Sequence, residues 1–470
     1  MSILIPGCMV VGTDYTSPAT ITPDAWHQSL TSDLNSGSSS LEEWWTRFND
    51  PTLNRLISTA RESNRDLAIA FERITEAHAA RGIARSQLFP SLDFNGGVSR
   101  GRTSENIGSP SPPAGKTSDF WATGIDAGWE VDLFGGVRRS IEAADATAEG
   151  VEEVYRDTLV SLFAEVAYSY IQIRTLEERI RLADSNIKNQ QDSVNLTTDR
   201  LEAGLSPELD VSQATTNLAS TKAVIPSLRN QRNIALNRLA TLIGRYPSAA
   251  ETLLGGSKGI PQPSRSAGIG IPADLVRARP DIRAAERSLA AQTAAIGVAE
   301  ADLFPRFTLN GTFQLQSDTA SSLLASQSRT YGFGPNFSWN IFSGGRIQSQ
   351  INIEDSRTKQ AYYNYQSTVL KAVEEVENAL SSVSNERDRY SALNDAVIAS
   401  AKTVSLVQDN YREGLIDFQN VLDAQRTIFA NEDERAISEG QIAASYVALY
   451  KALGGGTRMK PGEVASKDKS

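Results

Sequence analysis

Two glycine–leucine pairs, Gly204-Leu205 and Gly414-Leu415, each have acidic, amide, phenol or guanidinium side chains close by in the sequence. Such side chains form hydrogen bonds and ion pairs, which contribute about 0.5–1 kcal/mol each when they are exposed or half-exposed. Contacts of this strength can hold two surfaces together and still break readily. The polar residues that we single out beside the two pairs are Asp210, Tyr411, Asn420, Asp423 and Arg426.

Simpler interpretations remain open for each of these residues. An acid in the first turn of a helix is favoured by the helix dipole, which would account for Asp210 and Asp423 without any further role. Tyr411 can be one more member of a heptad pattern. Gly204 and Gly414 are expected to end helices in any case.

Little in the 470-residue chain suggests catalysis. Its only histidines are His27 and His78 and its only cysteine is Cys8, which excludes a cysteine-rich zinc site and an intramolecular disulfide. We find no glycine-rich phosphate loop that opens a helix after a strand, no nucleophile elbow and no histidine pair four residues apart. We therefore expect no catalytic residues, no metal and no cofactor. The formal net charge of -10 also argues against a nucleic-acid partner.

The stretch 348–453 predicts a long helical hairpin. From Val369 onward apolar or small residues recur at steps of three and four, and no proline interrupts 346–412. Gly414 interrupts the pattern, and a second helical pattern begins near Phe418. No run of eighteen apolar residues occurs in the chain, so no transmembrane helix is expected.

The chain contains two copies of one unit. Leu88-Phe89-Pro90 recurs as Leu303-Phe304-Pro305 at a shift of 215 residues, and Gly204-Leu205 recurs as Gly414-Leu415 at a shift of 210. Further matches occur in the same order along both copies. They are Asp66-Leu67 with Asp281-Ile282, Asn95-Gly96 with Asn310-Gly311, and Trp129 with Trp339.

Between its helical patterns, each copy changes to an alternation of apolar and polar residues that is typical of strands. The alternation covers about 91–134 in the first copy and about 306–342 in the second. Each strand is about ten residues long, enough to cross a bilayer when tilted. Pro335 lies inside one strand, where we expect a bulge or a locally open register. An ordinary hairpin packed on helices is the alternative.

Four strands cannot close a membrane barrel, because small barrels of this kind have about eight strands and an open strand edge cannot face lipid. If the strands span a membrane, several chains must therefore share the barrel. A trimer would supply twelve strands.

The segment that precedes the repeats has a different character. Apolar residues, a small residue and Cys8 match a bacterial lipoprotein processing site, so we interpret 1–8 as a signal-peptide remnant and Cys8 as a lipidation site. An incidental buried cysteine is the alternative. Trp44, Trp45 and Phe48 are expected to pin the following strap to the helices. The expected divisions are 9–50 for an extended strap, 51–245 for repeat one with its turn at 204, 246–271 for an equatorial linker, 272–453 for repeat two with its turn at 414, and 454–470 for a disordered tail.

Several segments, taken together and in this order, carry a family resemblance. They are Gly7-Cys8 with Val11–Tyr15, the two Leu-Phe-Pro motifs, Trp129–Phe134, Gly334–Phe342 and Tyr411–Arg426. The chain resembles the TolC-like outer membrane factor family, most closely its lipoprotein (NodT-type) branch from multidrug efflux pumps. The resemblance covers essentially residues 8–455.

The resemblance implies a homotrimer that forms a twelve-stranded β-barrel in the bacterial outer membrane and a long α-helical barrel, a tunnel across the periplasm. The implied function is a passive exit duct for drugs and small molecules in a tripartite efflux pump. Its implied partners are a periplasmic adaptor (membrane fusion) protein, an inner-membrane transporter of the resistance-nodulation-division type and outer membrane lipid.

The resemblance also implies a gate at the periplasmic tip of the tunnel. By motif, gate positions fall on Asp423 and Asn420, with Arg426 one turn on, and Asp210 bonds across helices to Tyr411. Part of the family has a second acid where this chain has Asn420, so the ring of negative charge at the gate is weaker here. Part of the family has an arginine where this chain has Ile416, so the hydrogen bond that this arginine would form is absent or replaced. The implied adaptor-docking tips are Gly204, Leu205, Gly414 and Leu415.

Two other functions are weighed against the efflux duct. One is a duct for protein secretion with the same fold, against which the region around Cys8 favours efflux. The other is a periplasmic or cytosolic coiled-coil scaffold without a pore. Conductance in planar bilayers would separate the scaffold from both ducts.

Overall fold

The computed structural model describes residues 10–19, 23, 25–28, 34–35, 41–106, 115–256, 259–264, 267–268 and 279–456. The chain divides into two compact units. We call residues 1–19, 73–151 and 284–365 the sheet unit, and residues 20–72, 152–283 and 366–470 the hairpin unit. Cys8 and the proposed signal remnant 1–8 lie outside the described residues.

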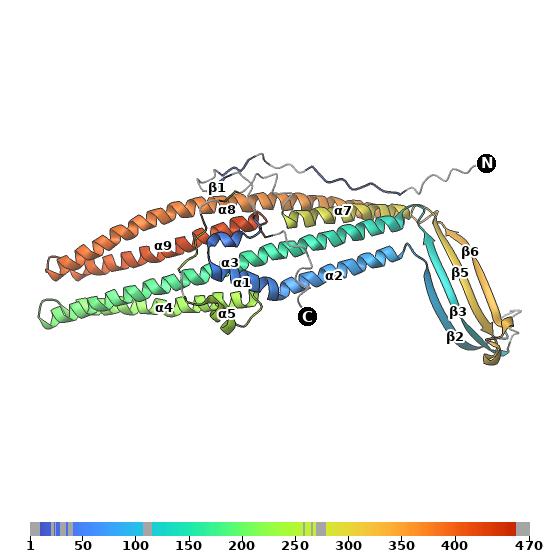
Figure 1. Ribbon diagram of the computed structural model, residues 1–470, viewed down its shortest axis with the longest axis horizontal. Coiled ribbons are helices and arrows are strands. Elements are labelled where there is room, and N and C mark those ends of the chain that lie inside the picture. Colours follow the sequence, from blue (N-terminus) through green and yellow to red (C-terminus); the bar gives the residue numbers. More distant parts are fainter. Residues whose placement is uncertain are drawn as a thin grey trace. The chain divides into compact units, whose positions relative to one another are not determined.

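Two helical hairpins make up most of the hairpin unit (Figure 1). The first consists of α3 (Gly136–Glu202) and α4 (Glu208–Leu242), and the second consists of α8 (Arg346–Arg412) and α9 (Phe418–Ala452). The outgoing helix has 67 residues and the returning helix has 35 residues in both hairpins. A helix of 67 residues is about 100 Å long. The predicted long hairpins and the internal repeat are therefore both confirmed.

The segment that follows Asp50 forms two helices, α1 (Pro51–Ser63) and α2 (Arg65–Ser86). Asn64 separates them with an extended backbone. Its side-chain oxygen accepts a hydrogen bond from the amide of Leu67 at 2.8 Å, and its amide nitrogen donates to the carbonyl of Leu242 at 2.8 Å. An asparagine that caps a new helix and bonds to a distant carbonyl ends the preceding helix, because its own backbone cannot then be helical.

The sheet unit contains one antiparallel sheet of four strands in the order β2-β3-β5-β6. The strands are β2 (Ser91–Arg102), β3 (Thr117–Val131), β5 (Arg306–Ser317) and β6 (Arg329–Ser338). Two short 3₁₀ helices, Ala320–Ser322 and Ser326–Ser328, connect β5 to β6. The remaining helix of this unit is α7 (Pro280–Ala301), which continues from the hairpin unit and precedes β5.

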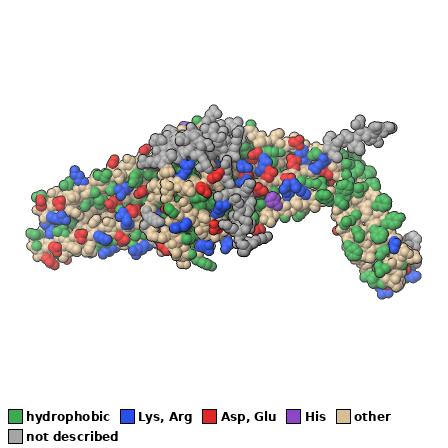
Figure 2. Space-filling view, in the orientation of Figure 1, with side chains coloured by type: hydrophobic (Ala, Val, Ile, Leu, Met, Phe, Trp, Pro, Cys, Tyr) green, Lys and Arg blue, Asp and Glu red, His purple; other side chains and the backbone are tan. Residues whose placement is uncertain are grey.

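The strand register sorts the side chains of the sheet by polarity. One cross-strand row contains Phe94, Ile125, Phe313 and Tyr331, and the adjacent row contains Asp93, Asp126, Thr312 and Gly332. Since successive residues of a strand point to opposite faces, one face is aromatic and aliphatic and the other is polar. Phe313 remains 51% exposed, and Figure 2 shows apolar side chains gathered over the strands. The apolar face thus has no partner within the described chain.

The prediction of a bulge at Pro335 is wrong. Leu309 pairs with Pro335 in an unbroken register, and β6 lies at the edge of the sheet. Within one chain the outer side of β6 has no strand partner, so the missing N–H of proline breaks no ladder hydrogen bond there. The strand is also shorter than expected, since Trp339 and Ile341 lie beyond its end at Ser338.

Two tryptophans bind the turns that lead from helix to strand. The indole nitrogen of Trp129 donates to the carbonyl of Leu88 at 3.0 Å, and that of Trp339 donates to the carbonyl of Leu303 at 3.0 Å. Both carbonyls belong to Leu-Phe-Pro motifs, whose proline ends each helix. The two repeats thus use the same bond to direct their strands away from the helices.

The linker and the tail are more ordered than the sequence suggests. The expected linker 246–271 contains the helix α5 (Pro247–Leu254), whose Leu254 is fully buried. A short parallel pair joins β1 (Leu34–Asn35) to β4 (Ala267–Gly268), which adds a second sheet to the four strands expected. The tail prediction is wrong for 454–456, which are buried, and residues 457–470 lie outside the described part.

The aromatic residues near position 45 anchor the chain as predicted. Trp44, Trp45 and Phe48 are buried in a short 3₁₀ helix, Trp44–Phe48. Trp44 stacks on Tyr450 with 5.3 Å between ring centroids, and Trp45 meets Phe163 edge-on at 4.9 Å.

The first described segment, 10–19, docks on the sheet unit through Arg139. The guanidinium of Arg139 donates to the carbonyls of Val11 at 2.9 Å and Gly12 at 3.0 Å, and to the carboxylate of Asp14 at 2.8 Å. Gly12 has a φ of 91°, and a Cβ there would lie 2.6 Å from the Cα of Gly297. Only glycine fits this crossing, so the segment is held in one register.

Candidate functional site

The two hairpin turns have the same backbone geometry. The amide of Gly204 donates to the carbonyl of Leu201, and the amide of Leu205 donates to that of Arg200; Gly414 and Leu415 repeat both bonds 210 residues later. Both glycines have positive φ, 71° and 77°. This pattern is the Schellman motif, which satisfies the last carbonyls of a helix and needs glycine at its left-handed position.

The turns expose the apolar side chains that follow the glycines. Leu205 is 66% exposed and Leu415 is 68% exposed. Gly204 has open space around the position of a missing Cβ. The four residues predicted as docking tips therefore lie on the surface of the described chain.

Tyr411 joins the two hairpins next to these turns. Its hydroxyl, at the end of α8, donates to the carboxylate of Asp210 in the first turn of α4 at 3.0 Å. The structure thus contains the hydrogen bond that the resemblance implied. Burial and the Asp210 carboxylate raise the pKa of Tyr411 above its usual value, whereas Ser206 and Arg200 act in the opposite direction. The phenol is therefore neutral and available as a donor at neutral pH.

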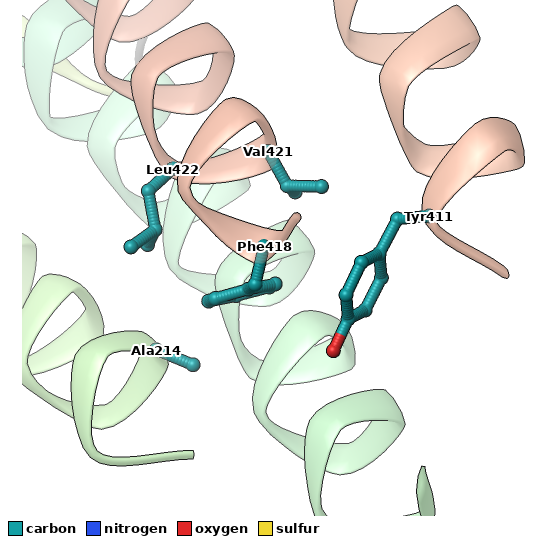
Figure 3. Close-up of a cluster of buried hydrophobic side chains, with 5 residues drawn as sticks. All are labelled: Ala214, Tyr411, Phe418, Val421 and Leu422. Atoms are coloured by element: carbon teal, nitrogen blue, oxygen red, sulfur yellow. The ribbon is translucent and has the colours of Figure 1, made fainter. Parts of the chain in front are cut away.

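A small apolar cluster supports this bond (Figure 3). It consists of Ala214, Tyr411, Phe418, Val421 and Leu422, all nearly inaccessible. Ala214 comes from α4, and the other four residues come from both helices of the second hairpin. The rings of Tyr411 and Phe418 have centroids 5.2 Å apart. The phenol is consequently fixed by packing as well as by its hydrogen bond.

The other predicted gate residues are arranged differently. Asp423 and Asn420 are exposed, and their bonds to described residues lie within the second hairpin: Asp423 accepts from Gln419 at 3.0 Å, and Asn420 donates to the carbonyl of Asp417 at 3.2 Å. Arg426 crosses to the first hairpin, where it donates to Asn217 at 3.2 Å. Asp423 is the sixth residue of α9, so the simpler explanation by the first turn of a helix does not apply to it.

Further polar contacts between the hairpins were not foreseen. Arg179, Asn186, Ser193 and Arg200 follow one another at intervals of seven residues along α3. Each of them bonds to the second hairpin. The contacts are Arg179 with Asp433 at 2.7 and 2.9 Å, Asn186 with Glu432 at 2.9 Å, Ser193 with Gln425 at 2.7 Å, and Arg200 with the carbonyl of Arg412 at 2.9 Å.

We call these four contacts, together with Tyr411–Asp210 and Arg426–Asn217, the hairpin seam. A cavity of about 300 Å³ lies along it, lined mainly by polar residues of α3, α8 and α9. The heptad spacing of polar residues on α3 was the available sequence signal. A helix prediction from apolar periodicity alone does not use this signal.

Other kinds of site are not evident in the described part of the chain. No group of three or more histidine, cysteine or acidic side chains there is placed to hold a metal ion. None of the helices among the described residues combines the length and the apolar character of a membrane-spanning segment.

Comparison with known proteins identifies relatives over nearly the whole chain. A family model described as "Outer membrane efflux protein" matches residues 56–245 and 271–455. Nodulation protein T of Rhizobium leguminosarum bv. trifolii is 31% identical over 460 residues, which cover 97% of this chain and 96% of the relative. The toluene efflux pump outer membrane protein TtgC of Pseudomonas putida is 31% identical, with 98% and 95% covered.

The solved structure of the outer-membrane channel OprN is also similar. It superposes with a TM-score of 0.88 and 36% sequence identity, and the match covers 95% of this chain and 99% of that one.

Proposed function

This chain belongs to the outer membrane efflux protein family, and we propose that its hairpins form the wall of an exit duct that closes at the two turns. The protein is an outer membrane channel of an efflux pump, as relatives such as TtgC are. The observation that carries the proposed gate is the Tyr411–Asp210 bond, a breakable contact of the hairpin seam that lies beside both turns.

The strand count supports a shared barrel. Four strands leave two open edges, at β2 and β6, and open edges cannot face lipid. Three copies of the chain supply twelve strands, which closes the sheet and leaves its apolar face toward lipid. The functional form is therefore a homotrimer in the outer membrane that extends into the periplasm.

The exposed tips suit a docking role. Leu205 and Leu415 present apolar surface beside the backbone of Gly204 and Gly414. We propose that a periplasmic adaptor binds there and connects the duct to an inner-membrane transporter of the resistance-nodulation-division type. Asp423 and Asn420 would line the closed end, and Arg426 would hold α9 to α4 through Asn217.

The way in which the segment 10–19 is held supports the proposal that Cys8 is lipidated. Three residues after this cysteine the chain is already held: the amide of Val11 donates to the carbonyl of Phe134 at 3.0 Å, and Arg139 donates to the carbonyls of Val11 and Gly12. A segment fixed so close to the cysteine would keep an acyl anchor next to the start of the helices. Apart from this lipid, we propose no cofactor and no catalytic activity, because the relatives are channel proteins.

Conductance measurements test the proposed gate. Purified trimers in planar bilayers should show a low resting conductance, and Asp423→Ala combined with Tyr411→Phe should raise it several-fold by removing one inter-hairpin bond and one charge at the tip. Asp355→Ala, on the surface of α8 and far along the helix from the turn, serves as the control and should leave the conductance unchanged. An unaltered conductance in the double variant would count against a gate at the turns.

A further inference from the structure

Arg200 connects the two hairpins at a point where neither the sequence motifs nor the predicted gate assigned a role. It lies in the last turn of α3, and its Nη1 donates to the carbonyl of Arg412 in the last turn of α8 at 2.9 Å. The last carbonyls of a helix carry a partial negative charge, so a cation is a favourable partner for them.

The same guanidinium covers the ring of Tyr411. Its Cζ lies 4.9 Å from the ring centroid, within the range of cation–π attraction. The ring also packs against Phe418, with 5.2 Å between centroids, and its hydroxyl reaches Asp210. The phenol is thus enclosed by a cation from one hairpin and an aromatic ring from the other.

The polar environment leaves Arg200 no other partner of comparable strength. It forms no ion pair with a carboxylate among the described residues, and its Nε is buried without a hydrogen-bond acceptor in that part of the chain. A buried, unpaired donor costs stability. The two contacts with α8, the hydrogen bond from Nη1 and the cation–π contact, must offset this cost.

The internal repeat shows that the shared turn does not require this arginine. The equivalent position in the second hairpin is Asn410, whose carbonyl accepts the same turn hydrogen bond from Leu415 that Arg200 accepts from Leu205. Since the Schellman geometry uses only the backbone, both side chains are free to differ. What Arg200 adds is a reach to the other hairpin, which the shorter Asn410 side chain lacks.

We propose that Arg200 is a positioning residue of the closed tip, which holds the phenol of Tyr411 against Asp210 by covering its ring and binding the end of α8. This inference rests on the proposed gate. It deepens that proposal, because it assigns the closure to a group of three residues, of which two come from the first hairpin.

Variants of Arg200 test the inference by resting conductance in planar bilayers. Arg200→Gln, which removes the cation and keeps most of the side-chain length, should raise the conductance about fivefold. Arg200→Lys keeps the charge but not the planar group and should give a smaller rise. Arg181→Gln removes an exposed arginine of the same helix that pairs with Glu178, and it should change nothing.

Combination with Tyr411→Phe separates positioning from general destabilisation. If Arg200 acts through the phenol, Arg200→Gln should add little to the conductance of Tyr411→Phe, while the melting temperature of the detergent-solubilised trimer stays within a few degrees for all variants. Fully additive effects, or no effect of Arg200→Gln where Tyr411→Phe opens the channel, would overturn the inference alone. No effect of any of these variants in a conducting trimer would instead refute the gate.

Discussion

The two halves of α3 bury one face of the same helix with opposite chemistry. Between 159 and 176 most buried positions are apolar, including a set spaced three or four residues apart; between 186 and 197 the buried positions are polar. The apolar set is Leu159, Phe163, Val166, Tyr170, Ile173 and Leu176, and the polar set is Asn186, Gln190, Ser193 and Thr197. The change occurs at Leu182 and Ala183, close to the first contact of the hairpin seam at Arg179.

The apolar half of α3 mainly stabilises the fold, whereas the polar half mainly holds the two hairpins together beside their turns. Each apolar side chain of the first half contributes about 1.5–3 kcal/mol by leaving water. The hydrogen bonds of the second half contribute about 1 kcal/mol each, because the same groups bond to water when the hairpins part. One helix therefore has a half that stays packed and a half that can separate from its neighbour at small cost.

The largest expected effect is in the apolar half. Phe163→Ala removes a fully buried ring that packs on Trp45 and should lower the free energy of unfolding by about 3–5 kcal/mol. Denaturant unfolding of the detergent-solubilised protein, followed by circular dichroism, measures it. Tyr168→Ala, at an exposed position of the same helix, is the control. A loss under about 1 kcal/mol at Phe163 would remove the contrast between the two halves.

An intermediate effect is expected where the halves meet. A Cβ at Gly440 of α9 would lie 2.1 Å from Oγ1 of Thr175 in α3, so Gly440→Ala should cost about 1–3 kcal/mol by forcing the helices apart. Thr175→Ala in the same chain removes the nearest atoms and should restore part of the loss in the same denaturant experiment. If Thr175→Ala does not restore stability, the close approach of Thr175 is not the reason that alanine is unfavourable at position 440.

A pH effect of about 1 kcal/mol is expected from Tyr170. Its hydroxyl donates to Asp50 at 2.6 Å, and burial together with this carboxylate raises its pKa to about 12. Because the folded value lies above the unfolded value near 10, the contribution is complete below pH 10 and is lost as the pH rises through 12. At pH 11 the loss should be about 1 kcal/mol. Tyr170→Phe should reduce the fall in stability between pH 10 and 11 by about 1 kcal/mol, and an equally steep fall in that variant would assign the effect to other groups.

The smallest effect on unfolding is expected in the polar half. Gln425→Ala removes the bond to Ser193, whose hydroxyl also bonds to the carbonyl of Asn189, so no buried group is left unpaired. The cost should be about 1 kcal/mol or less. The resting conductance should nonetheless rise, and a loss comparable to that of Phe163→Ala would show that the seam is part of the structural core.

Most of the fold could be predicted because it depends on periodic patterns. The apolar steps of three and four, the alternating strands and the two repeats specify helices, sheet and turns without knowledge of distant contacts. Features that depend on a distant partner were missed. Asn64 ends a helix by reaching Leu242, and 454–456 are buried against Trp44 and Phe163.

The candidate site was predictable only where a motif included it. Tyr411 and Asp210 were found through the family resemblance, whereas Arg200 and the polar heptad of α3 belong to no quoted motif. The repeat matches Trp129 with Trp339, but a sequence match does not indicate which carbonyl each indole nitrogen binds. An arginine in the last turn of a helix is common, and the sequence around Arg200 does not reveal that its guanidinium covers the ring of Tyr411.

The close contact at Gly440 also makes the second hairpin a lever. From Gly440 to Phe418, the first residue of α9, there are 22 residues, or about 33 Å of helix at 1.5 Å per residue. A tilt of roughly 5° about this contact would displace the end of α9 by about 3 Å, the length of one hydrogen bond. A rotation too small to disturb the packing around Thr175 would thus be amplified, over six turns of helix, into a shift beside the turn as large as the 3.0 Å that separates the phenol from its carboxylate.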